Sequence, residues 1–379
     1  MDKKLGLGAL TALVLSSMLG AGVFSLPQNM AAVAGPAALL VGWLITGVGI
    51  LFLSLAMLML TRLKPELDGG IFTYARAGFG ELTGFCSAWG YWLCAVIANV
   101  SYLVIVFSAL SFFTDRPGHI LFGDGNTWQA MLGASVLLWL VHGLVLRGVQ
   151  TAASINLLAT LGKLIPLLLF VVLALLAFNY DRFKFDFQGV ALGQPLWQQV
   201  KQTMLITLWV FIGVEGAVVV SARARHKKDV GRATMMAVIA ALLVYLLVTL
   251  LSLGVVPRAE LAQMRNPSMA GLMQHLLGHC GDAVIAVGLI ISVCGAYLSW
   301  TIMAAEVPFL AAQQGAFPRA IARQNRHGSP AASLWLTNGS VQLCLILIAL
   351  TGADYNSLLT SASEMILVPT CWWVCIGSK

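Results

Sequence analysis

Long apolar segments alternate with short polar connections along almost the whole chain. Each segment is long enough to cross a bilayer as a helix. They lie at about residues 5–32, 37–61, 84–113, 128–147, 152–178, 201–221, 233–256, 283–311, 332–352 and 357–376. None shows the alternating pattern of a transmembrane β-strand. The pattern therefore predicts an all-α polytopic membrane protein with about ten transmembrane helices.

Two of these segments, the first and the sixth, are interrupted near their middle. Residues 16–27 carry three serines, two glycines and a proline, and residues 209–217 carry a carboxylate between two glycines. In hydrocarbon, non-helical backbone survives only where it is buried in protein or lines a cavity. Paired interruptions in corresponding positions of two halves indicate the central site of a transporter. The alternative for the first stretch is close helix packing, because Ser16 and Gly20 have the small-xxx-small spacing.

The position of the two breaks predicts an internal repeat. If the first five and the last five segments are repeats of opposite topology, the two interrupted helices are equivalent. We therefore expect a first repeat at 1–178, an outer loop at 179–200, a second repeat at 201–376 and a cytoplasmic end at 377–379. Free N–H groups at one half-helix attract a carboxylate and free C=O groups at another attract an ammonium. A zwitterion fits such a site.

Composition and charge placement agree with a membrane protein and predict its orientation. The 379 residues are 59% hydrophobic and only 10% charged, against about 25% charged in soluble domains. Fifteen of the 22 Lys and Arg residues fall in connections on one side and six on the other. By the positive-inside rule, both termini are expected in the cytoplasm. The net charge of +7 thus reflects topology and gives no argument for binding nucleic acid.

No other chemistry stands out in the connections. His275 and His279 have helical i, i+4 spacing beside Cys280, which makes a metal site conceivable, but without a further ligand we interpret them as a solvated helix face. Residues 63–81 read as turns at the inner surface. No nucleotide-binding glycine loop and no nucleophile–base arrangement is present. We expect no metal, no cofactor, no disulfide framework and no enzyme activity.

Several motifs resemble one family of transporters. They lie at residues 19–27, 209–215 and 315–318, with longer matches at 67–75 and 84–92. They are similar to motifs of the amino acid–polyamine–organocation (APC) superfamily and, more narrowly, of its basic amino acid/polyamine antiporters. The resemblance runs to about Pro369. It implies a five-plus-five inverted-repeat fold with discontinuous helices 1 and 6, and exchange by alternating access.

The resemblance also implies roles in substrate binding. Gly20, Ala21 and Gly22 match the break that receives the substrate carboxylate, although the middle position is serine in related arginine/agmatine antiporters. Trp209 matches the aromatic on which a guanidinium stacks, and Ile212 matches a wall residue. A largely desolvated guanidinium over a tryptophan face gains about 2 kcal/mol.

Three further residues have weaker support from the same resemblance. Asn99 matches a polar contact from the third segment, but a polar residue there can also join two helices. Tyr91 resembles an outer gate residue, and Trp300 resembles a lid of the pocket. Packing or interface roles are the alternative for membrane tryptophans.

Two ionisable residues within predicted membrane helices are candidates for gating and coupling. Glu215 lies in the second break, where it senses the substrate or acts as a gate; a protonated acid bonded to free backbone is the alternative. Lys163 lies in the middle of the fifth segment. In several proton-coupled relatives a lysine there points at the first segment, so Lys163 is a hypothetical substitute for a bound cation. A fixed charge paired with carbonyl groups is the alternative. Glu306 and Glu364 are weaker candidates.

The leading hypothesis is an antiporter of the inner membrane that exchanges arginine for ornithine without a cofactor. Another cationic amino acid or polyamine exchanger, a proton-coupled uptake permease, and a non-transporting or inactive truncated protein are the alternatives. The family continues with two more helices where this chain ends at Lys379. We therefore expect the last two of twelve helices to be missing, which puts a homodimer in doubt. The other expected partners are the substrate and the lipid bilayer.

Overall fold

The computed structural model describes residues 4–64, 66–67, 70–116, 118–264 and 267–351. Every regular element in these residues is a helix. They are α1 Leu7–Met18, α2 Gly22–Val33, α3 Pro36–Leu63, α4 Ile71–Phe79, α5 Glu81–Thr114, α6 Trp128–Leu146, α7 Val149–Leu176, α8 Tyr180–Lys184, η1 Val190–Leu192, α9 Leu196–Val210, α10 Gly216–Val219, η2 Ser221–Arg223, α11 Lys227–Val255, α12 Arg258–Gln263, α13 Ser268–Leu277, α14 His279–Gln313, η3 Arg319–Ala322 and α15 Ala331–Thr351.

The expected all-helical membrane fold is confirmed. Among the described residues, eight helices are long and apolar enough to cross a membrane, with α1 and α2 counted as one. The sixth predicted segment is divided into α9 and α10, so the two discontinuous helices stand where the glycine patterns placed them. The tenth predicted segment, with Glu364 and Pro369, lies outside the described residues.

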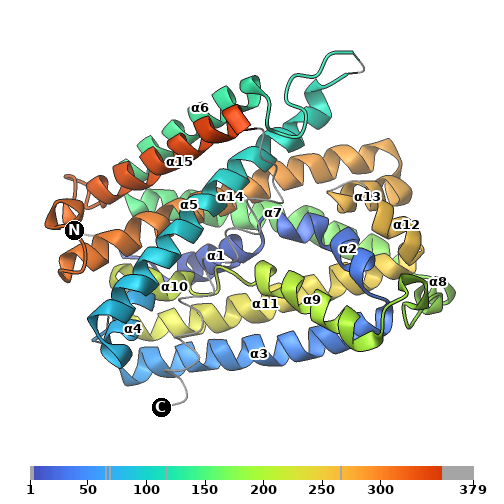
Figure 1. The fold of residues 1–379 in the computed structure, drawn as a ribbon, viewed down its shortest axis with the longest axis horizontal. Coiled ribbons are helices and arrows are strands. Elements are labelled where there is room, and N and C mark those ends of the chain that lie inside the picture. The colour runs from blue at the N-terminus through green and yellow to red at the C-terminus, as the bar shows by residue number, and fades with distance from the viewer. Residues whose placement is uncertain (1–3, 65, 68–69, 117, 265–266, 352–379) are drawn as a thin grey trace.

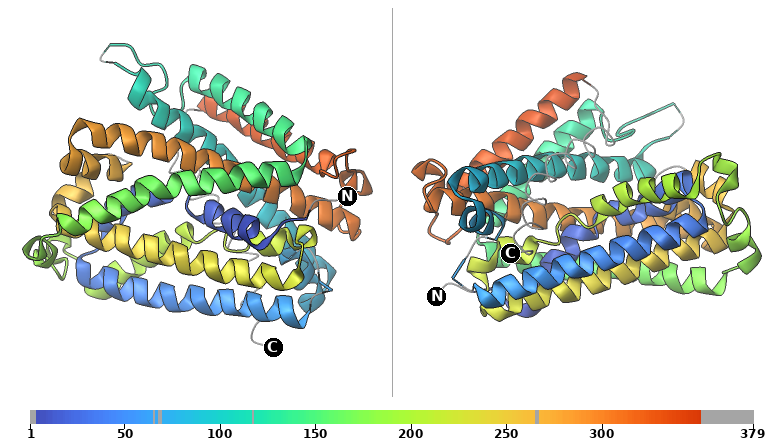
Figure 2. Two further views of the ribbon diagram at one scale, coloured as in Figure 1. Left: turned by 180° about the vertical axis from the view of Figure 1, so that it is seen from behind. Right: turned by 60° about the horizontal axis from the view of Figure 1, so that its bottom comes forward.

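The broken helices lie at the centre of the bundle (Figure 1). On one side of them α11 packs along α1 and α3, and on the other α14 packs along α5 and α7. The pair α6 and α15 lies at the upper edge of the view. Seen from behind, α7 crosses over α1 (Figure 2). Long helices therefore enclose the two breaks on both sides.

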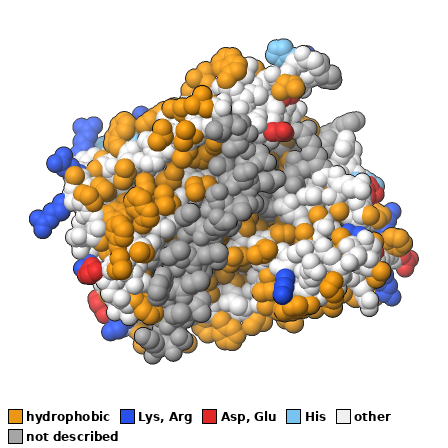
Figure 3. All heavy atoms as spheres, viewed as in Figure 1, with side chains coloured by type: hydrophobic (Ala, Val, Ile, Leu, Met, Phe, Trp, Pro, Cys, Tyr) orange, Lys and Arg blue, Asp and Glu red, His pale blue; other side chains and the backbone are white. Residues whose placement is uncertain are grey.

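The surface agrees with a bilayer around the bundle. Charged side chains gather at the left and right ends of the face in Figure 3, and apolar side chains occupy much of the described surface between them. The left end carries residues 4–6 and the loops at 147–148, 220–226 and 314–330. We call it the basic end, because these stretches carry Arg and Lys residues, and most of them have no Asp or Glu next to them in the sequence.

Two connections differ from their expected form. Residues 63–81, which read as turns, contain α4, because its nine residues lie between Gly70 and Gly80, two glycines with positive φ angles of 58° and 93°. His275 and His279 do not share one helix. Gly278, with a φ angle of 68°, ends α13 and starts α14 between them. The helical spacing of the two histidines was therefore a wrong interpretation.

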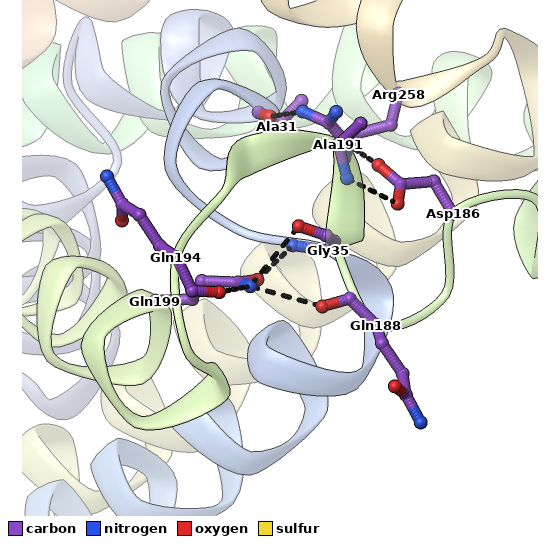
Figure 4. A network of polar contacts seen from close by, with 9 residues as sticks. Ala31, Gly35, Asp186, Gln188, Ala191, Gln194, Gln199 and Arg258 are labelled. Atoms are coloured by element: carbon purple, nitrogen blue, oxygen red, sulfur yellow. Dashed lines mark hydrogen bonds and ion pairs between the residues drawn. The ribbon is translucent and has the colours of Figure 1, made fainter.

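A buried polar network closes the end opposite the basic end (Figure 4). The Gln199 side chain accepts the Gly35 N–H at 2.9 Å and donates to the Gln188 carbonyl at 3.1 Å. Arg258 pairs with Asp186 at 2.8 Å and donates to the Ala31 carbonyl at 3.0 Å. The network thus joins the loop before α9 to the end of α2 and the start of α12.

We expect Arg258→Gln to destabilise the protein. The Arg258 side chain is 7% exposed, and a buried hydrogen bond to a charged group contributes about 2 kcal/mol. The midpoint of thermal unfolding of the purified protein should fall. The same exchange at Arg232, which is exposed on α11, should leave the midpoint unchanged. An equal midpoint for both variants would contradict the importance of this network.

Candidate functional site

The break between α1 and α2 exposes backbone carbonyl groups that the helix no longer satisfies. Helix α1 ends at Met18, where the Gly20 N–H folds back onto the Met18 carbonyl at 2.8 Å, and α2 starts at Gly22. Two glycines in three residues disfavour a continuous helix, and Pro27 in α2 lacks an N–H for the preceding turn. Buried carbonyl groups need partners, and here those partners are side chains of other helices.

Lys163 of α7 is the partner of two of these carbonyl groups. Its Nζ lies 2.9 Å from Ser16 Oγ, 3.3 Å from the Ser16 carbonyl, 3.0 Å from the Leu19 carbonyl and 3.2 Å from the Ser292 carbonyl. The Ser292 hydroxyl of α14 also donates to the Leu19 carbonyl at 2.8 Å. Lys163 is fully buried. Its ammonium therefore joins the end of α1 to α14 in the manner of a coordinated cation.

Tyr245 of α11 joins the two broken helices to each other. Its hydroxyl lies 2.8 Å from the Met18 carbonyl at the end of α1 and 2.7 Å from the Val210 carbonyl at the end of α9. The ring stacks on Trp43 with 6.1 Å between centroids and meets Phe211 edge to face at 5.3 Å. One fixed hydroxyl therefore meets the ends of both half-helices.

The start of α2 leaves backbone donors unused. Within the described part of the chain, the N–H groups of Ala21, Gly22 and Val23 donate to no protein acceptor. They carry the partial positive charge of a helix N-terminus, which attracts anions. An added Cβ at Gly20 would lie 3.0 Å from the Tyr102 ring, so glycine allows this close approach. The break is thus suited to hold a carboxylate.

The second break is tied to the first. Gly213, with a φ angle of 107°, turns the chain between α9 and α10, and its carbonyl accepts the Ser17 hydroxyl at 3.0 Å. Glu215 is 3% exposed and accepts the Gly213 N–H at 3.1 Å. The carboxyl group of Glu215 lies close to the side chains of Tyr91 and Cys94 on α5. Glu215 therefore faces α5 as well as its own loop.

A narrow cavity lies where the breaks meet α5 and α14. Its lining residues are Ser17, Met18, Gly20, Gly22, Cys94, Ala98, Tyr102, Trp209, Val210, Ile212 and Trp300. Only about 10 Å³ of it is free for water-sized molecules, whereas ligand pockets measure about 300–1,000 Å³. An amino acid can therefore occupy this place only after the half-helices or the lining side chains move.

The structure brings together most of the expected binding residues. Five of them line the cavity: Gly20, Gly22, Trp209, Ile212 and Trp300. Ala21 contributes backbone to the break but does not line the cavity. Asn99 is not a lining residue but follows Ala98, which is one. It is fully buried, and neither polar atom of its side chain has a hydrogen-bond partner in the described part of the chain. Such a group is costly, so Asn99 keeps its capacity for another contact.

Tyr91 and Trp300 form a layer on one side of the cavity. Their rings stack with centroids 6.0 Å apart, and the Tyr91 hydroxyl contacts the Met303 sulfur at 3.7 Å. The Trp300 indole donates to the Ser17 carbonyl at 3.2 Å. On α5, Tyr91 lies nearer to Glu81 and the basic end than the cavity residues Cys94, Ala98 and Tyr102 do. This layer therefore separates the cavity from the basic end.

The sequence did not single out several residues of the site. They are Cys94, Tyr102, Tyr245 and Ser292, whereas Ser16 and Ser17 stood in the first interrupted stretch but were given no contact of their own. A hydroxyl in an apolar helix usually bonds to its own backbone, so Ser292 gave no signal. Tyr245 gave a weak one, because membrane tyrosines gather at the interfaces and this residue stands in the middle of a predicted segment.

Two central helices broken at the same depth around a cavity define a secondary transporter, and comparison with known proteins narrows the class. A model of the amino acid permease family matches residues 5–376. The chain belongs to this family.

Three relatives illustrate the similarity. A protein of Escherichia coli K12 named "Putative arginine/ornithine antiporter" is 78% identical over 97% of this chain and 80% of its own length. The arginine/ornithine antiporter of Pseudomonas aeruginosa is 48% identical over 99% of this chain and 79% of its own. The arginine/agmatine antiporter of Chlamydia abortus is 43% identical over 96% of this chain and 76% of its own.

The fold also matches a solved structure. A Na⁺-coupled sialic acid symporter in a substrate-bound, outward-open state aligns with a TM-score of 0.59 at 11% identity, over 92% of this chain and 76% of that one. This similarity supports the transporter fold alone.

Proposed function

We propose that the chain exchanges arginine for ornithine by alternating access. The observation that carries the proposal is the meeting of both breaks with Trp209 at one cavity. The relatives named arginine/ornithine antiporter support the choice of substrates. Both substrates carry one positive charge, so one-for-one exchange moves no net charge and needs no ATP. The protein then has no enzymatic step.

In this proposal each part of the substrate meets a different element. The carboxylate lies at the break formed by residues 20–22, where the N–H groups of residues 21–23 have no acceptor among the described residues, and the cationic side chain lies over Trp209 and beside Ile212. Asn99 turns its unpaired amide to the substrate. Among the described residues no acidic side chain lines the cavity, so the cation binds through aromatic and dipolar groups. Such binding is weak enough for release at each half-cycle.

The remaining residues control the movement. Tyr91 and Trp300 form a gate toward the basic end, and Glu215 senses the state of that gate through its proximity to Tyr91. Lys163 takes the place of a bound cation and couples the end of α1 to α14. With the basic end in the cytoplasm, the Tyr91 gate faces inward, not outward as the sequence resemblance implied.

We further propose the arrangement in the cell. The chain lies in the inner membrane with both termini in the cytoplasm, because the Arg-rich loops at 220–226 and 314–330 lie at the same end of the bundle as residues 4–6. Residues 1–178 form one repeat and residues 201–376 form the inverted second repeat, joined by the outer loop 179–200, with a cytoplasmic end at 377–379. Lipid surrounds the bundle, and a homodimer is a further proposal.

Exchange can be measured in proteoliposomes. Vesicles loaded with ornithine should take up labelled arginine rapidly, and empty vesicles should not. Equal uptake into empty vesicles would contradict obligate exchange and favour proton-coupled uptake. Competition by agmatine or polyamines stronger than that by ornithine would favour another cationic exchange. Binding of arginine without any flux would indicate a protein that does not transport.

Trp209→Leu tests the aromatic contact with the substrate. Loss of about 2 kcal/mol of cation–π energy should raise the KM for arginine about 30-fold. The midpoint of thermal unfolding should change little, because Trp209 is only half-buried. Trp197→Leu removes an indole that is 58% exposed on the same helix and should leave KM unchanged. An unchanged KM in the Trp209 variant would exclude the stacking role.

A further inference from the structure

A second and larger cavity opens at the basic end. It measures about 540 Å³ and lies apart from the substrate cavity, since the two share none of their described lining residues. Five separate stretches supply its lining: residues 4–5, 147–151, 222–223, 306–313 and 324–328. Loops that are distant in sequence therefore meet around one space.

The lining of this cavity is strongly positive. Lys4, Arg147, Arg223 and Arg326 stand against a single carboxylate, Glu306, among the described lining residues. Glu306 forms an ion pair with Arg223, whose Nε lies 2.9 Å from Glu306 Oε2. For the side chains of Lys4 and Arg147, no acceptor is found in the described part of the chain.

The guanidinium group of Arg223 has one N–H donor for which the described residues supply no hydrogen-bond acceptor. Its Nη1 donates to the Gly328 carbonyl at 3.2 Å. Its Nη2 is shielded from solvent yet has no acceptor among the described residues. A shielded guanidinium nitrogen without an acceptor is costly, and an anionic oxygen in the cavity would satisfy it. Topology explains an excess of positive residues at this end but not an unmet donor in its interior.

The start of α7 adds backbone donors on the same side. Gly148 precedes this 28-residue helix with a φ angle of 138° and has no side chain to cap it. Within the described residues, the N–H groups of Val149, Gln150 and Thr151 have no acceptor, and all three residues line the cavity. Free N–H groups beside guanidinium groups are the usual donors to a phosphate.

We propose that this cavity binds a phosphate-type anion at the basic end of the protein. Arg147, Arg223, Arg326 and the N–H groups at the start of α7 hold its oxygens. The anion is either free inorganic phosphate or the headgroup of an acidic phospholipid, since both present the same oxygens.

The bound anion would hold the basic end closed. Residues 4–5 already pair with the segment after α10, because the Leu5 N–H donates to the Arg223 carbonyl at 2.8 Å and the Arg225 N–H donates to the Leu5 carbonyl at 2.7 Å. An anion that contacts Lys4, Arg147 and Arg326 adds bonds across the same junction. Opening this end for exchange requires the junction to part. Anion binding therefore slows exchange, an effect that rests on the proposed function.

The first test measures binding without transport. The purified full chain should show a higher midpoint of thermal unfolding in phosphate than in chloride at equal ionic strength. Arg147→Gln combined with Arg326→Gln should weaken the apparent phosphate affinity at least about tenfold, as expected for lost charge-assisted contacts. Arg225→Gln combined with Arg319→Gln removes two exposed positive charges at the same end but outside the cavity and should leave the affinity unchanged. The proposal would be overturned if neither phosphate nor phosphatidic acid raised the unfolding midpoint. It would also be overturned if both double variants lost phosphate affinity equally.

The second test distinguishes the sources and uses exchange. In phosphatidylcholine vesicles, phosphate at the basic end should slow exchange if the free anion is the ligand. If only phosphatidic acid in the bilayer slows it, the ligand is a headgroup. In either case the Arg147/Arg326 variant should escape the inhibition and the control variant should not. Binding of phosphate with no exchange in any vesicle would refute the proposed antiport while supporting the anion site.

Discussion

Replacing Lys163 by methionine is expected to lower arginine/ornithine exchange about 100-fold or more. The substitution removes four contacts of the buried ammonium, with Ser16, Leu19 and Ser292. Each unsatisfied buried acceptor costs about 1–3 kcal/mol, and about 3 kcal/mol in total corresponds to a factor of about 100 in rate. The end of α1 should lose its link to α14, so that the two halves no longer move together.

The rate of exchange as a function of pH measures this effect. Lys201→Met, at an exposed lysine of α9, is the matched control and should keep the wild-type rate. Ser292→Ala removes one hydroxyl from the same carbonyl cluster and should have a smaller effect than loss of Lys163. If Lys163→Met kept both the rate and its pH dependence, coupling through this lysine would be refuted. A lower unfolding midpoint at a normal rate would leave Lys163 a purely structural role.

Gly213→Ala is expected to have an effect of similar size. The φ angle of 107° at Gly213 is unfavourable for alanine, at a cost of about 1–3 kcal/mol. The new Cβ would lie 2.6 Å from Ser17 Oγ and 2.9 Å from Ser17 Cβ, and such overpacking costs about 1–3 kcal/mol more. The two breaks should be pushed apart, which should lower exchange about 100-fold and lower the unfolding midpoint.

A second substitution separates the clash from the backbone strain. Ser17→Gly removes both of the closest atoms, so it should restore part of the exchange to the Gly213→Ala protein, while the strain remains. Gly49→Ala in α3, where no atom lies within 4 Å of the added Cβ, should be neutral or slightly stabilising. Wild-type exchange in Gly213→Ala would show that the breaks tolerate a wider spacing.

The parts of this molecule that depend on backbone were predictable from sequence. Hydropathy located the long helices, and the glycines at 20, 22, 213 and 216 located the two breaks, because two glycines so close together disfavour a continuous helix. Trp209 could be predicted because it stands beside a break in sequence. The contact between Lys163 and the first helix came from the family resemblance, and the structure shows it in three hydrogen bonds to Ser16 and Leu19.

Other features depend on which helices meet and could not be read from one sequence. Tyr245 and Ser292 satisfy carbonyl groups of helices more than 200 residues away, and no local pattern records such a partner. The stacking of Tyr91 on Trp300 depends on how α5 and α14 cross. That the Asn99 side chain has no hydrogen-bond partner among the described residues depends on how the whole bundle packs. Helix α4 was missed because two flanking glycines resembled a turn.

The single proton of the Tyr245 hydroxyl introduces an asymmetry between the two broken helices. The Met18 carbonyl already accepts the Gly20 N–H, whereas for the Val210 carbonyl the phenol is the partner found among the described residues. Withdrawing α1 from the phenol leaves no orphaned acceptor, but withdrawing α9 does. Breaking the contact with α1 therefore costs less free energy than breaking the contact with α9. At this joint we therefore expect α1 to part from α11 before α9 does.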